Sequence, residues 1–112
     1  MESTRQHKIA RLIQKEMADI FLRESKRFQI QGMLTVTKAY VSKDLAVARV
    51  YVSVFGADDP VKVIEQIRIH TREIRTIFGN RVKSQLRVIP QIDFFIDDSL
   101  DYIENIERLL HD

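Results

Sequence analysis

Hydrophobic residues recur at helical spacing over the first part of the chain. From Thr4 to about Glu24 they share one side of a 3.6-residue period, as Ile9, Leu12, Ile13, Met17, Ile20 and Phe21. Ser3 or Thr4 can accept a hydrogen bond from the free N–H groups of the first turn. The pattern predicts an amphipathic helix over this segment.

The next two segments alternate like strands. Residues 33–42 and 45–55 are rich in Val, Thr and Tyr. In the second segment, Ala46, Ala48, Val50, Val52 and Val54 alternate with Val47, Arg49, Tyr51 and Ser53. The short polar link Ser42-Lys43-Asp44 predicts an antiparallel hairpin with Lys43 exposed at its tip.

A helical pattern returns after Gly56. Asp58-Asp59-Pro60 supplies an acidic cap followed by proline at the first helical position. The apolar side then carries Val63, Ile64, Ile67, Ile74, Ile77 and Phe78. The pattern weakens at Gly79-Asn80, resumes through Val82 and Leu86, and stops before Pro90. We therefore expect two consecutive helices with a kink between them.

The chain closes with a strand pattern and a further helical pattern. Ile92, Phe94 and Ile96 alternate with Asp93, Phe95 and Asp97, and a helix is expected from Asp98 or Ser99 onward, burying Ile103, Ile106 and Leu110. The predicted order is α-β-β-α-α-β-α. It indicates an α+β fold, with a three-stranded sheet covered by helices on one face and a crossover before the third strand. One domain over residues 1–112 is expected.

Composition narrows the functional classes. The 112 residues include no cysteine, which excludes disulfides, thiolate catalysis and cysteine-based zinc sites. The N-terminus lacks the pattern of a signal peptide, and no apolar run approaches the roughly 20 residues of a membrane span. We expect a cytoplasmic protein that neither enters a membrane nor is exported.

Charge is segregated along the chain, although the net charge is only +2. Residues 68–87 carry six Lys or Arg against one acid, whereas residues 88–112 carry one Arg against seven acids. A polyanion such as RNA would meet the positive region.

The positive region supplies candidate phosphate-binding residues. Arg68, Arg72 and Arg75 are spaced at i, i+4 and i+7, which places them on one side of a helix. A similar ridge lies on the first helix, diluted by Glu16 and Asp19. The predicted RNA-binding residues are Arg68, Arg72, Arg75, Arg81, Lys83, Arg87, Lys8, Arg11, Lys15 and Lys43. The alternative is that these cations form only solvated helix surfaces.

Other chemistry has weaker support. The acids Asp93, Asp97, Asp98 and Asp101 suit a helix cap and the outer face of a strand better than catalysis. His7, His70 and His111 lie far apart, so neither a metal nor another cofactor is expected, and His70 is expected on a helix surface or at the kink. Tyr40, Tyr51 and Phe95 could stack on bases, but without an RNP-like string, packing in the core or on the sheet is the better interpretation.

Four short motifs give the chain a family resemblance. They are SKDL at residues 42–45, AxVYV at 48–52, LRxxP at 86–90 and FFxDDSL at 94–100. In this order and spacing they resemble the ribosome-binding factor A family. The resemblance implies a monomeric KH-like domain of the second type. It also implies a bacterial, non-enzymatic factor that binds the immature small ribosomal subunit and assists late maturation of 16S rRNA.

The chain departs from KH-like domains at the kink. The Gly-x-x-Gly loop of other KH domains is absent, because Gly32, Gly56 and Gly79 are the only glycines. The Ala-x-Gly kink of the resembled family is absent too. One alignment places the kink at residues 70–72 and another at 72–74, so we expect it between His70 and Asn80, with Gly79 as the visible helix breaker.

Two functional classes remain. The first is an assembly factor that binds the 30S subunit and 16S rRNA through a basic helical face. A GTPase or an initiation factor is then a candidate partner for displacing it. The second is a protein-interaction module whose acidic C-terminal face docks a basic partner such as a ribosomal protein.

Overall fold

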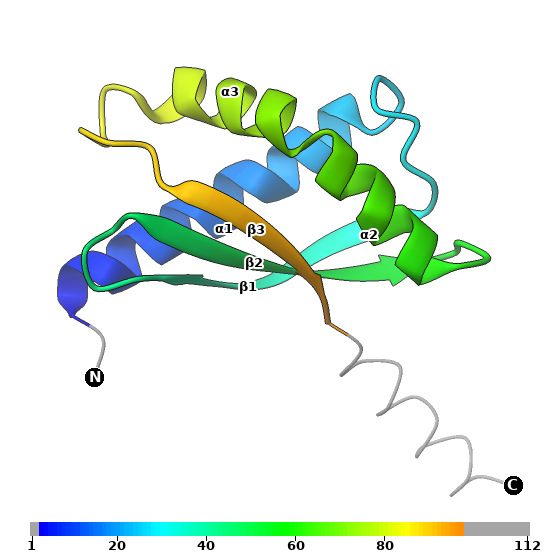
Figure 1. Cartoon of the computed structure of the whole chain (residues 1–112), viewed down its shortest axis with the longest axis horizontal. Coiled ribbons are helices and arrows are strands. Elements are labelled where there is room, and N and C mark those ends of the chain that lie inside the picture. The colour runs from blue at the N-terminus through cyan, green and yellow to red at the C-terminus, as the bar shows by residue number, and fades with distance from the viewer. Residues whose placement is uncertain (1–2, 98–112) are drawn as a thin grey trace, which may run out of the picture.

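A three-stranded sheet with three helices on one face forms the part of the chain that the computed structural model describes, residues 3–97 (Figure 1). The helices are α1 (Thr4–Glu24), α2 (Pro60–Ile69) and α3 (Thr71–Val82). The strands are β1 (Met33–Val41), β2 (Val47–Phe55) and β3 (Gln91–Ile96), in the sheet order β1-β2-β3. The predicted α+β order is confirmed through the third strand, and the helix expected from Asp98 or Ser99 lies outside the described residues.

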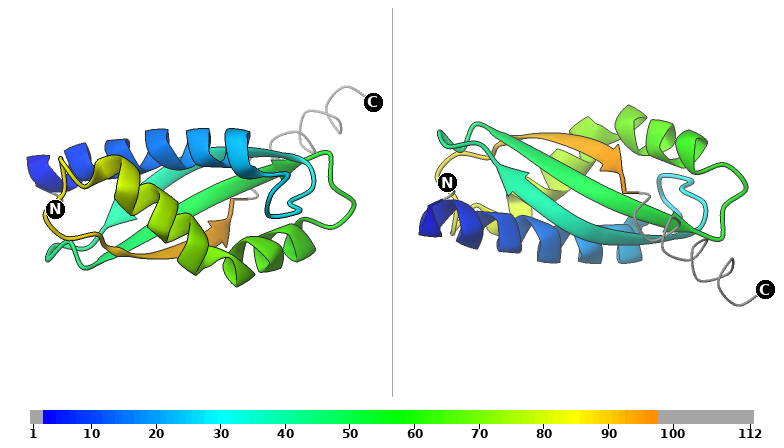
Figure 2. Two further views of the ribbon diagram at one scale, coloured as in Figure 1. Left: turned by 90° about the horizontal axis from the view of Figure 1, so that it is seen from above. Right: turned by 90° about the horizontal axis from the view of Figure 1, so that it is seen from below.

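The sheet is mixed. Strands β1 and β2 pair antiparallel, as the short polar link between them predicts. Strands β2 and β3 pair parallel, so the chain crosses over through α2 and α3 before it returns to the sheet. Figure 2 shows the three helices on one side and the opposite face of the sheet uncovered by any of them.

Helix α1 is fixed at its start and along β1. Ser3 Oγ accepts a hydrogen bond from Gln6 N, and Gln6 Oε1 accepts one from Ser3 N, which forms a capping box. The other end of the same amide, Gln6 Nε2, donates to the carbonyl of Val41 at 2.9 Å. About two turns further along α1, Gln14 Nε2 donates to the carbonyls of Val36 and Thr37. Side chains of α1 thus hold β1 by its backbone.

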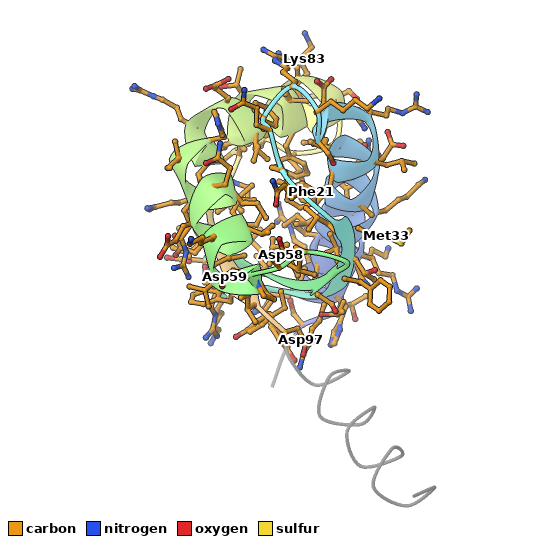
Figure 3. All side chains as sticks on the ribbon, turned by 90° about the vertical axis from the view of Figure 1, so that its right-hand side faces the viewer. Phe21, Met33, Asp58, Asp59, Lys83 and Asp97 are labelled. Carbon is orange, nitrogen blue, oxygen red and sulfur yellow. The ribbon has the colours of Figure 1, made fainter. Side chains whose placement is uncertain are left out.

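The core lies between the helices and the sheet. Phe21 of α1 meets Phe94 of β3 edge to face, with ring centroids 5.7 Å apart, and Figure 3 shows Phe21 in the interior. The largest fully buried side chains come from all three helices, all but the first strand, and the link after α1: Phe21, Phe28, Phe78, Phe94, Ile13, Met17, Ile20, Ile67, Ile74, Ile92, Val50 and Val52. The predicted inward alternation of β2 is therefore confirmed at Val50 and Val52.

The hairpin turn is longer than expected, because β2 begins at Val47 rather than Leu45. Leu45 adopts a left-handed backbone conformation with φ of 62°, which ends the extended pattern at that residue. Asp44 Oδ1 accepts hydrogen bonds from Ser42 Oγ at 2.7 Å and from Ala46 N at 3.1 Å. These bonds, the one from Ser42 first, lower the pKa of the Asp44 carboxyl. Lys43 is exposed at the tip, as predicted.

The kink lies at His70, and Gly79 does not break the helix. His70 ends α2 and precedes α3, which corresponds to the first of the two alignments of the kink. Its ring packs on Phe28, with centroids 4.9 Å apart. Helix α3 runs through Gly79 and ends at Val82 instead of continuing to Leu86. Ile89, in the segment before β3, packs on α3 at Gly79, where an added Cβ would lie 3.4 Å from the isoleucine side chain, at ordinary contact distance.

Candidate nucleic-acid interface

The arginines of α2 and α3, the two helices joined at the His70 kink, do not form the single continuous ridge that their spacing predicts. The break at His70 places Arg68 on α2 and Arg72 and Arg75 on α3. All three side chains are exposed. A prediction based on one straight helix fails here because the chain changes direction between the first arginine and the second.

Two of these arginines reach backbone carbonyls, one in edge strand β3 and the other in the link just before it. Arg68 donates to the carbonyl of Phe94 through Nη2 at 2.9 Å and through Nε at 3.2 Å. Arg75 donates to Pro90 O at 2.9 Å and to Ile89 O at 2.7 Å. Both side chains line a groove between the α2–α3 helix pair and β3, together with Thr71, Asp93 and Phe95.

The carbonyl contacts orient the two guanidinium groups without consuming all their donors. A guanidinium carries five N–H donors, and the bonds of each side chain involve only Nε and Nη2. Both side chains line the groove, and their remaining N–H donors make no other hydrogen bond within residues 3–97. Such an arrangement suits phosphate oxygens, which accept parallel hydrogen bonds from arginine. The exposed Arg72, next to this groove along α3, adds positive charge.

Arg81 has a different environment. Its Nη1 lies 2.6 Å from Asp19 Oδ2 and 3.4 Å from Glu16 Oε2, so it bridges α3 to α1. Asp19 also accepts hydrogen bonds from Arg23. The Arg81 bond, more than that of Arg23, lowers the pKa of the Asp19 carboxyl, and the same contact raises the pKa of Arg81. The sequence predicts Arg81 as a phosphate contact, but in the structure its charge is matched by two acids.

This bridge predicts a dependence of stability on pH. Because the folded-state pKa of Asp19 lies below the value of about 3.9 expected in the unfolded chain, the contribution of the bridge is present above that value and is lost as the pH falls through the folded-state pKa. Urea unfolding at pH 6 should show Asp19→Asn less stable than the parent chain. The difference should narrow towards pH 2.5, and a constant difference across this range would contradict the assignment.

The remaining predicted cations fall into separate groups. Lys43 sits at the hairpin tip, and Arg87 lines a hollow beside the same turn, with Arg5 and Asp44. Lys83 is exposed just after α3, at the outer surface in Figure 3. Lys15 lies next to Glu16 and Asp19. Lys43 and Arg87 thus place positive charge at one end of the molecule, where the hairpin turn and the link between α3 and β3 meet.

The other cations of α1 form a third group. Lys8 and Arg11 line a groove with two residues of β1, Lys38 and Tyr40. Lys38 does not belong to the predicted site. A β-bulge at Thr37 shifts the register of β1 between Val36 and Lys38, and the alternation of residues in the sequence does not reveal this shift. The predicted ridge on the first helix therefore meets the sheet at the edge opposite Arg68 and Arg75.

The acids and histidines give no sign of a metal centre in residues 3–97, where no group of three His, Cys, Asp or Glu side chains could hold an ion. Asp97 has a structural position: it is 8% exposed and accepts a hydrogen bond from Thr37 Oγ1 at 2.6 Å. The sequence predicts it on the outer face of a strand, but it lies one residue beyond β3 and is buried. Asp98, Asp101 and His111 lie outside the described residues. Among the helices of the described part, none is long and apolar enough to cross a membrane.

These features define a class of protein. A KH-like domain of the second type has the order αββααβ and a mixed three-stranded sheet, as this chain does. Its two central helices meet here at a kink without a Gly-x-x-Gly loop. The sequence profile of the family described as Ribosome-binding factor A matches residues 5–110. The chain belongs to the ribosome-binding factor A family.

Individual relatives agree with this assignment. A ribosome-binding factor A from Cytophaga hutchinsonii is 43% identical over 110 residues, covering 98% of this chain and 83% of the relative. One from Flavobacterium psychrophilum is 42% identical over 111 residues, covering 98% and 85%. The fold is similar to the crystal structure of ribosome-binding factor A from Thermus thermophilus, with a TM-score of 0.64, 23% identity, and coverage of 81% of this chain and 94% of that one.

Proposed function

We propose that this protein is a non-enzymatic assembly factor that binds the free or immature 30S subunit and assists late maturation of 16S rRNA. Membership of the ribosome-binding factor A family carries the proposal, because it rests on 43% identity over nearly the whole chain. A homology model of the Thermus thermophilus ribosome-binding factor A has been fitted into an electron cryomicroscopy map of its complex with the 30S subunit, which supports the 30S subunit as the partner.

The distribution of charge supports RNA as the bound surface. Arg68 and Arg75 are held beside β3 with donors to spare, and Arg72 is exposed on α3. Lys43 and Arg87 add charge at the hairpin end. Such cations suit recognition of phosphate positions on folded RNA rather than of base sequence. Of the predicted set, we exclude Arg81 and Lys15 from this surface, since both lie beside acids.

Sedimentation tests the proposal directly. The protein should co-sediment with free 30S subunits and not with assembled 70S ribosomes, since a maturation factor acts before the subunits join. Equal association with both would contradict a role in maturation. Loss of 16S rRNA processing in a strain that lacks the protein, with accumulation of its precursor, would support the finer assignment.

The salt dependence of binding tests the mode of contact. Each phosphate neutralised contributes a slope of about −0.7 to −0.9 to a plot of log K against log salt, so roughly five contacts should give about −3 to −5. Filter binding to 30S subunits between about 50 and 300 mM potassium chloride would measure this slope. A nearly flat dependence would show that phosphate contacts do not dominate the affinity.

A further inference from the structure

A row of aromatic rings crosses the face of the sheet that the three helices leave uncovered. Each strand contributes one ring: Tyr40 from β1, Tyr51 from β2 and Phe95 from β3. Tyr51 is directly opposite Phe95 in the parallel ladder, and Tyr40 is opposite Arg49 in the antiparallel one. The right-hand view in Figure 2, seen from below, shows that none of the described helices lies over this face.

The rings form one connected surface. Tyr51 and Phe95 are stacked, with centroids 5.5 Å apart and planes inclined by 28°. Tyr40 meets Tyr51 edge to face at 5.8 Å. Tyr40 remains 39% exposed, and the other two rings are half-buried. The expected sheet packing is therefore confirmed, but it occurs on the outer face and leaves aromatic surface accessible.

Cations stand over the middle ring of this aromatic row and over the ring at its β3 end. Lys38 Nζ lies 5.4 Å from the centre of the Tyr51 ring, and the Arg68 guanidinium lies 5.8 Å from that of Phe95. The row also ends in two basic grooves. Tyr40 lines the groove of Lys8 and Arg11 at the β1 edge, and Phe95 lines the groove of Arg68 and Arg75 at the β3 edge.

We propose that the aromatic row stacks unpaired bases of RNA, while the cations of the two grooves contact the phosphates on either side. This inference rests on the proposed function, in which RNA is the partner, and adds that the bound RNA includes a single-stranded segment. Proteins that hold single strands combine positive grooves with aromatic rings, because every base offers a face for stacking. One group of cations lies on α1 and the other on the α2–α3 helix pair. The aromatic row runs across the sheet between the two groups.

An acidic protein segment fits the row less well. Carboxylates would find Lys38 and Arg68 but would gain little from three adjacent rings, whereas bases gain from rings and cations together. The length of the row, two ring steps of 5.8 and 5.5 Å, leaves room for two or three bases. Stacking tolerates any base, so the site should show little preference for sequence.

Binding of two octamers to the full chain tests the proposal. One is a labelled octamer of uridine, and the other is an octamer of the same ribose-phosphate backbone without bases. Fluorescence anisotropy should show the uridine octamer binding at least about tenfold more tightly, because only it can stack. In the variant Tyr51→Leu/Phe95→Leu, this difference should disappear, while the affinity for the abasic octamer stays unchanged.

Phe55→Leu is the matched control, because Phe55 is 66% exposed and lies four positions beyond Tyr51 on the same strand. It should bind both octamers like the parent chain. If the double variant does not fold, Tyr40→Leu, at the most exposed ring of the row, should still reduce the affinity for uridine by about fivefold.

The outcomes separate the two proposals. Equal affinity of the parent chain for both octamers, or undiminished binding of uridine by the leucine variants, overturns stacking and leaves co-sedimentation with the 30S subunit untouched. Loss of the preference for uridine in the variants supports stacking. Failure of the parent chain to co-sediment with 30S subunits overturns the proposed function itself.

Discussion

Val52→Asp should lower the free energy of unfolding by at least about 3 kcal/mol, which corresponds to a fall of more than about 10 °C in Tm. Val52 is 0% exposed, lies in the middle strand of the sheet and pairs with Val36 on one side and Ile96 on the other. A carboxylate at this position would lose its water without gaining a partner, and the apolar contacts of the valine would be lost as well. Thermal unfolding followed by circular dichroism measures the effect.

Val47→Asp is the control for this prediction. It makes the same change on the same strand, but Val47 is 37% exposed and begins the strand, so the new carboxylate stays in water. Its Tm should stay within a few degrees of the parent value. If Val52→Asp behaved like this control, the inward register of β2 would be wrong by one residue.

Reversing exposed cations should abolish binding to the small subunit without unfolding the protein. The variant Arg72→Glu/Lys83→Glu/Arg87→Glu changes six charge units on exposed side chains. Arg68 and Arg75 are left intact, because their guanidinium groups also hold backbone carbonyls beside β3. The affinity for 30S subunits should fall by more than about 100-fold, since each lost contact becomes a repulsion. The Tm should change little, because exposed charges contribute only tenths of a kcal/mol.

The matched variant converts acids of the C-terminal part of the sequence, Asp101, Glu104 and Glu107, to lysine. It reverses the same number of charges in the opposite sense and should leave the affinity unchanged or raise it. If this lysine variant failed to bind the 30S subunit while Arg72→Glu/Lys83→Glu/Arg87→Glu still bound it, the acidic C-terminal segment would be the docking surface. A protein-interaction module would then replace the RNA-binding assignment.

Much of this fold could be predicted because its signals are local. Helix α1 begins and ends where the apolar spacing predicts, and its cap at Ser3 is three residues from the glutamine that completes it. The hairpin and its exposed Lys43 follow from a short polar link between two alternating segments. In each case the residues that decide the structure are neighbours in sequence.

The features that the sequence did not predict depend on contacts between distant residues. Phe28 packs on His70 at the kink, although the two residues are 42 positions apart in the sequence. No pattern around His70 reveals that contact. Arg81 looks like its neighbours in sequence until α1 brings Glu16 and Asp19 to it. The bulge at Thr37 moves Lys38 to the open face, where it joins an aromatic surface whose three members come from different strands. Candidate cations could be listed from sequence, but their grouping required the tertiary structure.

Side chains of α1 and of the α2–α3 helix pair donate hydrogen bonds to backbone carbonyls at the two edges of the sheet. These bonds affect the tendency of the protein to aggregate. Strands at a sheet edge can recruit a strand of another molecule, and an exposed aromatic face increases that risk. Here glutamines occupy carbonyls of β1, and arginines occupy carbonyls at β3. An incoming strand would have to displace charged or amide donors that are already satisfied. We expect these occupied edge carbonyls to let the chain expose an aromatic face to a polyanionic partner without forming intermolecular sheets.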